Sequence, residues 1–422
     1  MSQNKETKKK LLIIGITMQP AGTEKSFLSF ASCLDYDRYD VTLLLAKKDG
    51  MFLPLIPKQI HVVEMEQYDE MFTLHGGNAM RVIWNTMVKK NPLLLADILP
   101  FAFQMVLHRQ RHADLAMGMW CRLEKRFPDF HMPEIGEFDA AVAYWGDKTM
   151  FYMLDHVKAK KKIAWLHFDY TKPQRDDTLY EPAFSACDAI VTVSHPIETS
   201  LKEHFPLLAQ KIVCMENILD PKMIWDLALR GETFPDIHFT GKRILTVGRI
   251  AEQKGYDMVV EVLSRLRSDG YNVRWYIVGG GEEEAVDALK VLAVEKGVAD
   301  LLILLGNTMN PYTYMRDCDI YAQPSRHEGK PIAVEEAKIL YKTILTTDYL
   351  SSGEQLDGGN LGEICEISVD GIYEGIKKLL DNPFLCECYS DRLTEMTFGN
   401  TDEMNIFESL MNENTDASNH SV

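Results

Sequence analysis

Residues 244–255 read Ile-Leu-Thr-Val-Gly-Arg-Ile-Ala-Glu-Gln-Lys-Gly, an apolar run followed by a loop between two glycines. The apolar run predicts a buried strand, and apolar residues at helical spacing over 256–267 predict the helix that follows. Arg249 and Lys254 therefore lie on a strand-to-helix loop at the carboxyl end of a strand, where ligands bind in open α/β sheets. Two cations there can clamp a diphosphate through charge-assisted hydrogen bonds. Taken alone, the pair also fits an ordinary surface arginine and lysine.

The same alternation of strand and helix signals continues in both directions from this segment. Strands that alternate with helices predict a parallel, doubly wound sheet, and two such series follow one another here. The predicted fold class is therefore α/β, with two Rossmann-like domains that face a central cleft and a boundary between Asn217 and Lys242. The predicted strands cover residues 11–15, 41–45, 140–143, 162–166 and 189–193 in the first series, and 244–247, 273–278, 301–305, 319–322 and 343–346 in the second.

A second informative segment carries two spaced acidic residues. Residues 325–337 read Ser-Arg-His-Glu-Gly-Lys-Pro-Ile-Ala-Val-Glu-Glu-Ala, with Glu328 and Gly329 on a tight loop and Pro331 at the start of a helix. Proline at the first helical position loses no hydrogen bond, and the free N–H groups of a helix start suit a diphosphate. Glu336 lies about 7.5 Å beyond Pro331 along the helix axis, so one acid can lie near a sugar and the other near a ribose. A solvent-exposed acidic helix start is the alternative for this segment alone.

Together, the two segments resemble the donor site of retaining glycosyltransferases with the GT-B fold. The family is the large "glycosyl transferases group 1" family, of the family four type, which includes glycogen synthases and bacterial polysaccharide enzymes. It has a Gly-Arg…Lys-Gly loop and two glutamates eight positions apart, as Glu328 and Glu336 are here. The resemblance covers residues 242–380 closely and the N-terminal half of the chain only in outline.

The resemblance implies roles for the matching residues of the C-terminal half. Arg249 and Lys254 bind the donor diphosphate and offset charge on the leaving nucleotide. Glu328 contacts the donor sugar, and Glu336 holds the ribose hydroxyls. Glycines after the strand at 273–278 permit close backbone approach, and an asparagine after the next strand flanks the base. The implied catalytic residues are Glu328, His167, Arg249 and Lys254, and the implied donor-binding residues are Arg249, Lys254, Gly279, Gly280, Asn307, Glu328, Gly329, Lys330, Pro331, Ile332 and Glu336.

Candidate acceptor-side residues lie in the N-terminal half. In related enzymes a histidine at the end of a strand lies beside the donor sugar, and His167, after the predicted strand 162–166, fits that place. Asp169 is a candidate partner for the acceptor hydroxyl. A satisfied structural histidine is the alternative for His167. Relatives usually carry paired glycines in the first loop, whereas residues 18–24 keep only Gly22, so its contact with phosphate or acceptor stays open.

The resemblance also implies how the domains are used. We expect an acceptor domain over residues 1–220, a nucleotide-sugar donor domain over 241–398, and a helix over 399–413 that packs back on the first domain. Residues 78–132 interrupt the alternation as a helical, apolar and basic insertion. Over 78–126, eight Lys and Arg against three Asp and Glu give +5 (8 − 3) in a chain of −17. Such a segment predicts contact with an anionic membrane surface; a helical insertion packed on the domain is the alternative.

The composition is that of an ordinary globular protein, with 46% hydrophobic and 25% charged residues among 422. The charge of −17 argues against general nucleic-acid binding. The chain has no apolar run of membrane-spanning length, so we expect a cytoplasmic protein, peripheral at the inner face of the plasma membrane. Eight scattered cysteines predict reduced thiols. We expect no metal or other cofactor, because capping explains the Asp-x-Asp at 317–319, and His108 and His112 have no third ligand.

These observations predict a retaining, metal-independent glycosyltransferase that moves a sugar from a nucleotide diphosphate sugar, of the UDP class, to an acceptor hydroxyl. The similar bacterial enzymes imply a glycan or glycolipid acceptor, such as a lipid-linked or surface-polysaccharide precursor. Two alternatives stay open: a non-catalytic GT-B subunit that partners another glycosyltransferase, and a GT-B epimerase of UDP-sugars. The presence of both phosphate cations and both acids argues against the first, and product analysis separates the second.

Overall fold

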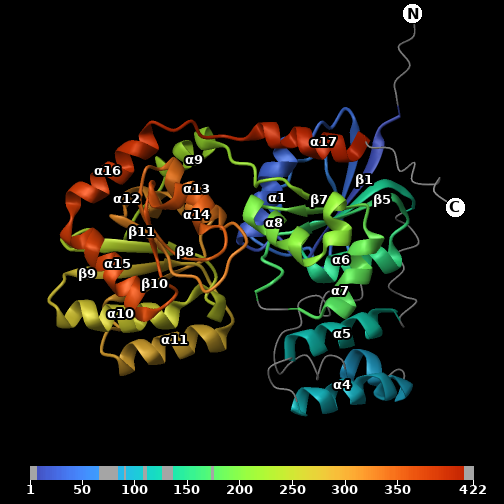
Figure 1. The fold of residues 1–422 in the computed structure, drawn as a ribbon, viewed down its shortest axis with the longest axis horizontal. Helices are drawn as coiled ribbons and strands as arrows, with labels where there is room; N and C mark the ends of the chain where they lie inside the picture. The colour runs from blue at the N-terminus through green and yellow to red at the C-terminus, as the bar shows by residue number, and fades with distance from the viewer. Residues whose placement is uncertain are drawn as a thin grey trace, which may run out of the picture.

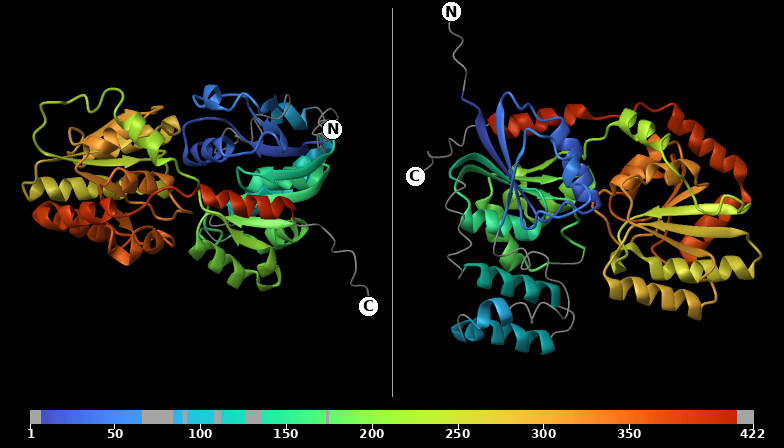
Figure 2. Two further views of the ribbon diagram at one scale, coloured as in Figure 1. Left: turned by 90° about the horizontal axis from the view of Figure 1, so that it is seen from above. Right: turned by 180° about the vertical axis from the view of Figure 1, so that it is seen from behind.

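Two α/β domains lie side by side in this protein, whose structure is a computed structural model (Figure 1). Views from above and from behind show the same two lobes (Figure 2). Both sheets are parallel, so the predicted α/β class with two doubly wound sheets is confirmed. No helix in the described part of the chain combines the length and apolar character of a membrane span. The structure describes residues 7–65, 84–89, 92–107, 112–125, 136–172 and 175–412.

The N-terminal domain is built on a sheet whose strand order, among the described residues, is β3-β2-β1-β4-β5-β6-β7. The central strand β1 is apolar from Leu11 to Ile14 because both faces are covered there: Leu12 and Ile14 point into one core cluster, and Leu11 and Ile13 into the other. The strands are β1 Lys9–Gly15, β2 Tyr39–Leu45, β3 His61–Glu64, β4 Phe138–Ala143, β5 Ala159–Leu166, β6 Ala189–Thr192 and β7 Ile212–Cys214. The helices are α1 Gly22–Ser32, α4 Leu95–Leu107, α5 His112–Lys125, α6 Asp147–His156, α7 Asp177–Ala186 and α8 His195–His204.

The C-terminal domain has the strand order β10-β9-β8-β11-β12-β13 over the described chain. The order reverses between β8 and β11, which makes the carboxyl ends of these two strands the topological switch point where ligands bind. The strands are β8 Lys242–Val247, β9 Val273–Val278, β10 Leu302–Gly306, β11 Ile320–Gln323, β12 Thr343–Thr347 and β13 Glu363–Cys365. The helices are α9 Pro221–Ala228, α10 Tyr256–Ser268, α11 Glu283–Glu295, α12 Tyr312–Asp317, α13 Ile332–Ile339, α14 Ser352–Gln355, α15 Val369–Asp381 and α16 Pro383–Thr394.

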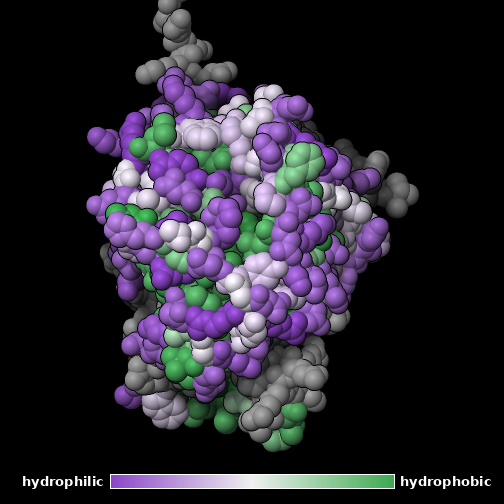
Figure 3. Space-filling view, turned by 90° about the vertical axis from the view of Figure 1, so that its left-hand side faces the viewer, coloured by the Kyte–Doolittle hydropathy of each residue, from purple (hydrophilic) through white to green (hydrophobic). Residues whose placement is uncertain are grey.

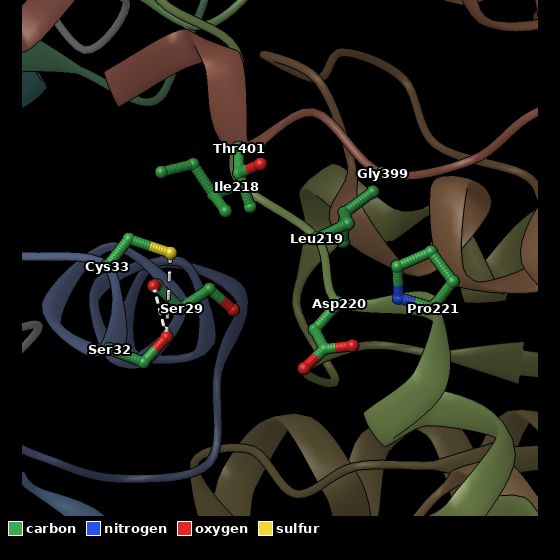
Figure 4. Close-up of a pocket in the computed structure, with 9 residues that line it drawn as sticks. All are labelled: Ser29, Ser32, Cys33, Ile218, Leu219, Asp220, Pro221, Gly399 and Thr401. Atoms are coloured by element: carbon green, nitrogen blue, oxygen red, sulfur yellow. Dashed lines mark hydrogen bonds between the residues drawn. The ribbon is translucent and has the colours of Figure 1, made fainter. Parts of the chain in front are cut away.

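The chain crosses between the domains twice, and the two crossings are tied together. Asn400 accepts a hydrogen bond from the Leu219 backbone N–H and donates one to the Asn217 carbonyl, both at 3.0 Å. After the second crossing, α17 Met404–Asn412 lies along the N-terminal lobe (Figure 2), where the buried Phe407 ring packs 4.9 Å from that of Phe30. A cavity of about 260 Å³ opens beside these crossings, between the C-terminal end of α1, at Ser32 and Cys33, and the linker (Figure 4).

Two helices form a hairpin that extends from the N-terminal domain. Helices α4 and α5 pack on each other and protrude below α6 and α7 (Figure 1). They belong to the predicted helical insertion at 78–132, of which residues 78–83, 90–91, 108–111 and 126–132 lie outside the described residues. The outer face of the C-terminal domain, at the other end of the molecule, is mainly hydrophilic and carries hydrophobic residues in small patches (Figure 3).

All ten predicted strands are present, but three others were missed. These are β3, β7 and β13, which lie at or next to sheet edges and contain only four, three and three residues. The predicted reduced thiols agree with the structure, in which the eight cysteines form no disulfide.

Candidate functional site

The loop after β8 is held by a glycine turn after β9. The Gly248 N–H donates to the Val278 carbonyl at 2.9 Å, and the Ile250 N–H donates to the Gly280 carbonyl at 2.6 Å. Gly279 has a φ of +146°, and a Cβ there would lie 2.1 Å from the Gly248 carbonyl oxygen, so only glycine fits. The predicted close approach thus serves to fix the loop, and the Arg249 side chain is left exposed at its tip.

The first predicted acid, Glu328, lies at the carboxyl end of β11 and is 6% exposed. Its Oε1 accepts hydrogen bonds from Lys254 Nζ at 2.6 Å, Ser325 Oγ at 2.5 Å and Gln323 Nε2 at 3.1 Å. Gln253 Nε2 donates to the other carboxylate oxygen at 3.3 Å. The two sequence segments therefore meet directly, because Lys254 follows β8 and Glu328 follows the adjacent strand.

The second predicted acid, Glu336, is 1% exposed on α13. This helix begins at Ile332, and Pro331 precedes it in an extended conformation as its N-cap residue. The prediction that Pro331 is the first residue of the helix is therefore wrong. The Gly329 carbonyl before it accepts from Ser351 Oγ at 2.5 Å, which holds the turn into the helix. Tyr312 donates its hydroxyl to Glu336 Oε1 at 2.7 Å.

The carboxyl ends of the two sheets meet across the domain boundary. A Cβ on Gly329 would lie 2.3 Å from the carbonyl oxygen of His167, and a Cβ on Gly22 would lie 3.7 Å from the Ile332 side chain. The predicted acceptor-side residues Gly22 and His167 are thus brought against the donor-side segment. Loops at the carboxyl ends of both sheets therefore contact each other at this point of the domain boundary.

His167 is packed among aromatic rings at the end of β5. Its imidazole lies parallel to the Trp165 ring at 6.3 Å and tilted against the Tyr144 ring at 4.8 Å. Desolvation lowers the pKa of His167 to about 3, so the ring is neutral at physiological pH. Its Nε2 is buried and has no hydrogen-bond partner among the described residues. A neutral imidazole with an unused nitrogen suits hydrogen bonding to a hydroxyl better than it suits binding of an anion.

Three predicted residues have partners that limit what their side chains can do. The buried Asp169 accepts from the backbone N–H and hydroxyl of Thr171 at 2.9 and 2.7 Å, which makes a local turn. Lys330 points to Glu216, with Nζ 2.6 Å from the carboxylate, so only its backbone N–H can reach a phosphate. Asn307 lies against the glycine turn, where a Cβ on Gly280 would approach its amide nitrogen to 2.8 Å.

Two neighbouring residues of α1 were missed by the sequence analysis. Lys25 donates to both carboxylate oxygens of Glu336, at 2.9 and 3.0 Å, across the domain boundary. The buried Glu24 stands beside Trp145, and burial raises its pKa to about 7, an effect that Trp145 and the charge of Arg249 partly oppose. Their signal in the sequence is an adjacent acid and base that follow Gly22 and Thr23 at the start of the predicted helix.

Potential metal ligands are few and lie away from Glu328. Among the described residues, two groups come close enough to hold an ion, and His195 belongs to both: one adds Glu198 and Cys214, the other Glu216 and Glu354. Lys330 supplies a fixed ammonium to the second group, through Glu216. The Asp317 carboxylate pairs with Arg316, and the Asp319 carboxylate accepts from the Arg243 backbone N–H at the start of β8, so both have partners within the fold.

Lys254, Glu328 and Glu336 thus lie together between two Rossmann-like domains, and comparisons with known proteins give the class. The family model "Glycosyl transferases group 1" matches residues 234–395. An uncharacterized glycosyltransferase of Haemophilus influenzae is 30% identical over 262 residues, which cover 61% of this chain and 70% of that protein. The chain belongs to the group 1 glycosyltransferase family, as its sequence predicts.

Further relatives include a Campylobacter jejuni protein, the N-acetylgalactosamine-N,N'-diacetylbacillosaminyl-diphospho-undecaprenol 4-alpha-N-acetylgalactosaminyltransferase. It is 26% identical over 211 residues, 50% of this chain, and the match spans 55% of that enzyme's own length. Among solved structures, Anabaena HepE in complex with UDP and glucose has a TM-score of 0.66 at 14% identity, over 96% of this chain and 100% of that one. Staphylococcus aureus TarM, solved with UDP, has a TM-score of 0.67 at 12% identity over the same shares. These neighbours confirm the GT-B fold.

Proposed function

We propose that this protein transfers a sugar from a UDP-sugar to an acceptor hydroxyl, with retention of anomeric configuration and without a metal ion. The observation that carries the proposal is the convergence of Lys254 and Glu328, 2.6 Å apart, at the switch point of the C-terminal sheet. His167 lies opposite them, next to Gly329. Lys254 can then offset charge on the leaving diphosphate, Glu328 can contact the sugar, and the neutral His167 ring offers a hydrogen bond from the other domain.

The donor class is supported by charge and by the structural neighbours. Arg249 and Lys254 supply two positive charges on the loop after β8, and the N-terminus of α13 adds backbone N–H groups and its dipole. That set suits a diphosphate leaving group with no divalent ion. HepE and TarM were solved with UDP, which favours uridine over guanosine or adenosine as the base here.

The acceptor class rests on the curated relatives. The Campylobacter relative acts on a diphospho-undecaprenol-linked sugar, and a further relative, CapM of Staphylococcus aureus, belongs to capsular polysaccharide biosynthesis. We therefore propose a lipid-linked or surface-polysaccharide precursor as acceptor. Retention is tested by the anomeric coupling constant of the product in NMR; an inverted anomer would contradict the proposed mechanism.

The first experiment is a thermal-shift panel of UDP-, GDP- and ADP-sugars in EDTA. A ligand at 100 times its Kd adds about 2.7 kcal/mol of stability, and we expect a shift with UDP-sugars that Arg249→Ala abolishes. Arg265→Ala is the matched control, because Arg265 is exposed and pairs with Asp370 on the surface of the same domain. A shift without transfer but with an epimerised donor would indicate an epimerase. Absence of any shift would favour a non-catalytic partner subunit.

We also propose that the protein works at the inner face of the plasma membrane, through the outer side of α4. Leu99, Phe103 and Leu107 are 59%, 66% and 59% exposed and are spaced four apart, so they form one apolar stripe. Exposed cations lie nearby on the hairpin at Arg122 and Lys125. An apolar stripe with flanking cations fits an anionic lipid surface.

Vesicle co-sedimentation tests this surface. We expect binding to vesicles with phosphatidylglycerol, weakened by 0.5 M salt and lost in Phe103→Glu. Phe384→Glu, on α16 of the other domain and 74% exposed in the native protein, serves as the matched control. Equal binding by both variants would contradict a role for the α4 stripe.

A further inference from the structure

One ion pair between the two domains within the site involves Lys25, which has no role in the function proposed above. Lys25 on α1 and Glu336 on α13 form an ion pair at 2.9 Å across the boundary where these helices face each other (Figure 1). The side chains are 17% and 2% exposed. The Lys25 ammonium also lies 4.6 Å from the centre of the Tyr312 ring, which favours a cation there.

The hydrogen-bonding capacity of Glu336 is nearly exhausted by these partners. A carboxylate has about four acceptor positions on its two oxygens. Lys25 donates to both oxygens, and the Tyr312 hydroxyl donates to Oε1 at 2.7 Å. One position is left, whereas a ribose diol needs two, one for each hydroxyl. A ribose cannot take its full place on Glu336 while Lys25 keeps both of its contacts.

We propose that Lys25 is a specificity-determining residue of the nucleotide site: it competes with the ribose diol for Glu336, so that only a nucleotide with both ribose hydroxyls displaces it efficiently. This rests on the proposed function, in which Glu336 accepts hydrogen bonds from the donor ribose. The competition also couples nucleotide binding to the domain boundary, because displacing Lys25 breaks an ion pair between α1 and α13.

Because the Glu336 carboxylate is charged and buried, the competition distinguishes nucleotides with two ribose hydroxyls from those with fewer. Two hydroxyls together replace the two hydrogen bonds that Lys25 gives up, but a single hydroxyl leaves a buried carboxylate with too few donors. A deoxyribonucleotide therefore binds without displacing Lys25 and gains nothing from Glu336. When Lys25 is removed, the Glu336 carboxylate is free before the nucleotide binds. Affinity then increases for nucleotides that have both ribose hydroxyls.

Isothermal titration of UDP and of 2′,3′-dideoxy-UDP tests this on the full chain. For Lys25→Met we expect UDP to bind about tenfold more tightly than to the wild type, with an unchanged Kd for the dideoxy nucleotide. If Lys25→Met does not fold, Lys25→Gln keeps a donor without the charge and should show a smaller gain of the same sign. Lys160→Met is the matched control with an unchanged Kd, because Lys160 is exposed and pairs with Asp139 at the amino-terminal ends of β5 and β4, away from their carboxyl ends.

The outcomes separate this inference from the proposed function. Equal or weaker UDP binding by the variant overturns the role of Lys25 and leaves the donor site intact. An equal gain for both nucleotides also overturns it, because Lys25 would then act only through domain closure. If UDP, GDP and ADP bind neither protein, both the inference and the proposed donor site fail.

Discussion

At the scale of single residues, the site depends on one backbone contact between the domains. Gly329 lies so close to the His167 carbonyl that an added Cβ would approach its oxygen to 2.3 Å. Backbone atoms on both sides leave no flexible side chain that can move away. The loop after β11 and the end of β5 therefore stay in register only while residue 329 has no side chain.

We predict that Gly329→Ala lowers kcat/KM about 100-fold, because a displacement near 1 Å at the reacting groups has an effect of that order. The measurement is sugar transfer with the donor found by thermal shift. Gly353→Ala is the matched control, since a Cβ there meets no atom within 4 Å. If Gly329→Ala keeps full activity, the close approach of these two loops is unimportant for catalysis.

Glu24 is predicted to make stability depend on pH. Burial raises its pKa from 4.5 to about 7, so the folded protein binds this proton more strongly than the unfolded chain does. The resulting stabilisation is complete below about pH 4.5 and is lost as pH rises through 7, by roughly 3 kcal/mol. We expect the Tm of Glu24→Gln, relative to the wild type, to rise between pH 5 and 8. As a control, the Tm of Glu295→Gln, at an exposed position, should follow the wild-type Tm at every pH. If the Tm of Glu24→Gln also follows the wild type, the Glu24 carboxyl ionises with an ordinary pKa and the prediction is wrong.

At the scale of elements, the strands that were predicted and those that were missed differ in burial. Central strands such as β1 and β8 are packed on both faces, which requires continuous apolar runs that can be recognised in the sequence. β7 and β13 have three residues each, and β3 has only partly buried or exposed side chains. So short a segment carries too little periodicity to be distinguished from a loop.

Helix α17 contributes to the stability of the N-terminal domain. Phe407 is fully buried against Phe30 and Tyr39, with ring centres 4.9 and 6.0 Å apart. We predict that Phe407→Ala destabilises this domain by about 3–5 kcal/mol, the usual effect of removing a buried ring. Thermal or urea unfolding measures it. Ser409→Ala, at an exposed position of the same helix, should change stability by less than about 0.5 kcal/mol; equal effects would mean that α17 is not docked.

At the scale of the whole molecule, we predict catalysis that does not need a divalent cation. Arg249 and Lys254 provide two positive charges near the expected position of the diphosphate. The N-terminus of α13 adds free backbone N–H groups. Sugar transfer should therefore persist in 5 mM EDTA. A loss that Mg²⁺ or Mn²⁺ restores would show that these cations are insufficient, and the same assay on Arg249→Ala should show no rescue by metal.

The sequence alone determined the two doubly wound sheets and the two donor segments, because strand burial and strand-to-helix loops leave local signals. The sequence assigned Glu328 and Glu336 to the C-terminal domain because both follow β11 closely. Glu328 lies on the loop after this strand, and Glu336 lies on α13, the helix after that loop. Only the tertiary structure decided their partners. Lys25 reaches Glu336 over 311 positions of the chain, and such an ion pair depends on how two domains meet. No local pattern records that arrangement, because it arises from packing between segments that are distant in sequence.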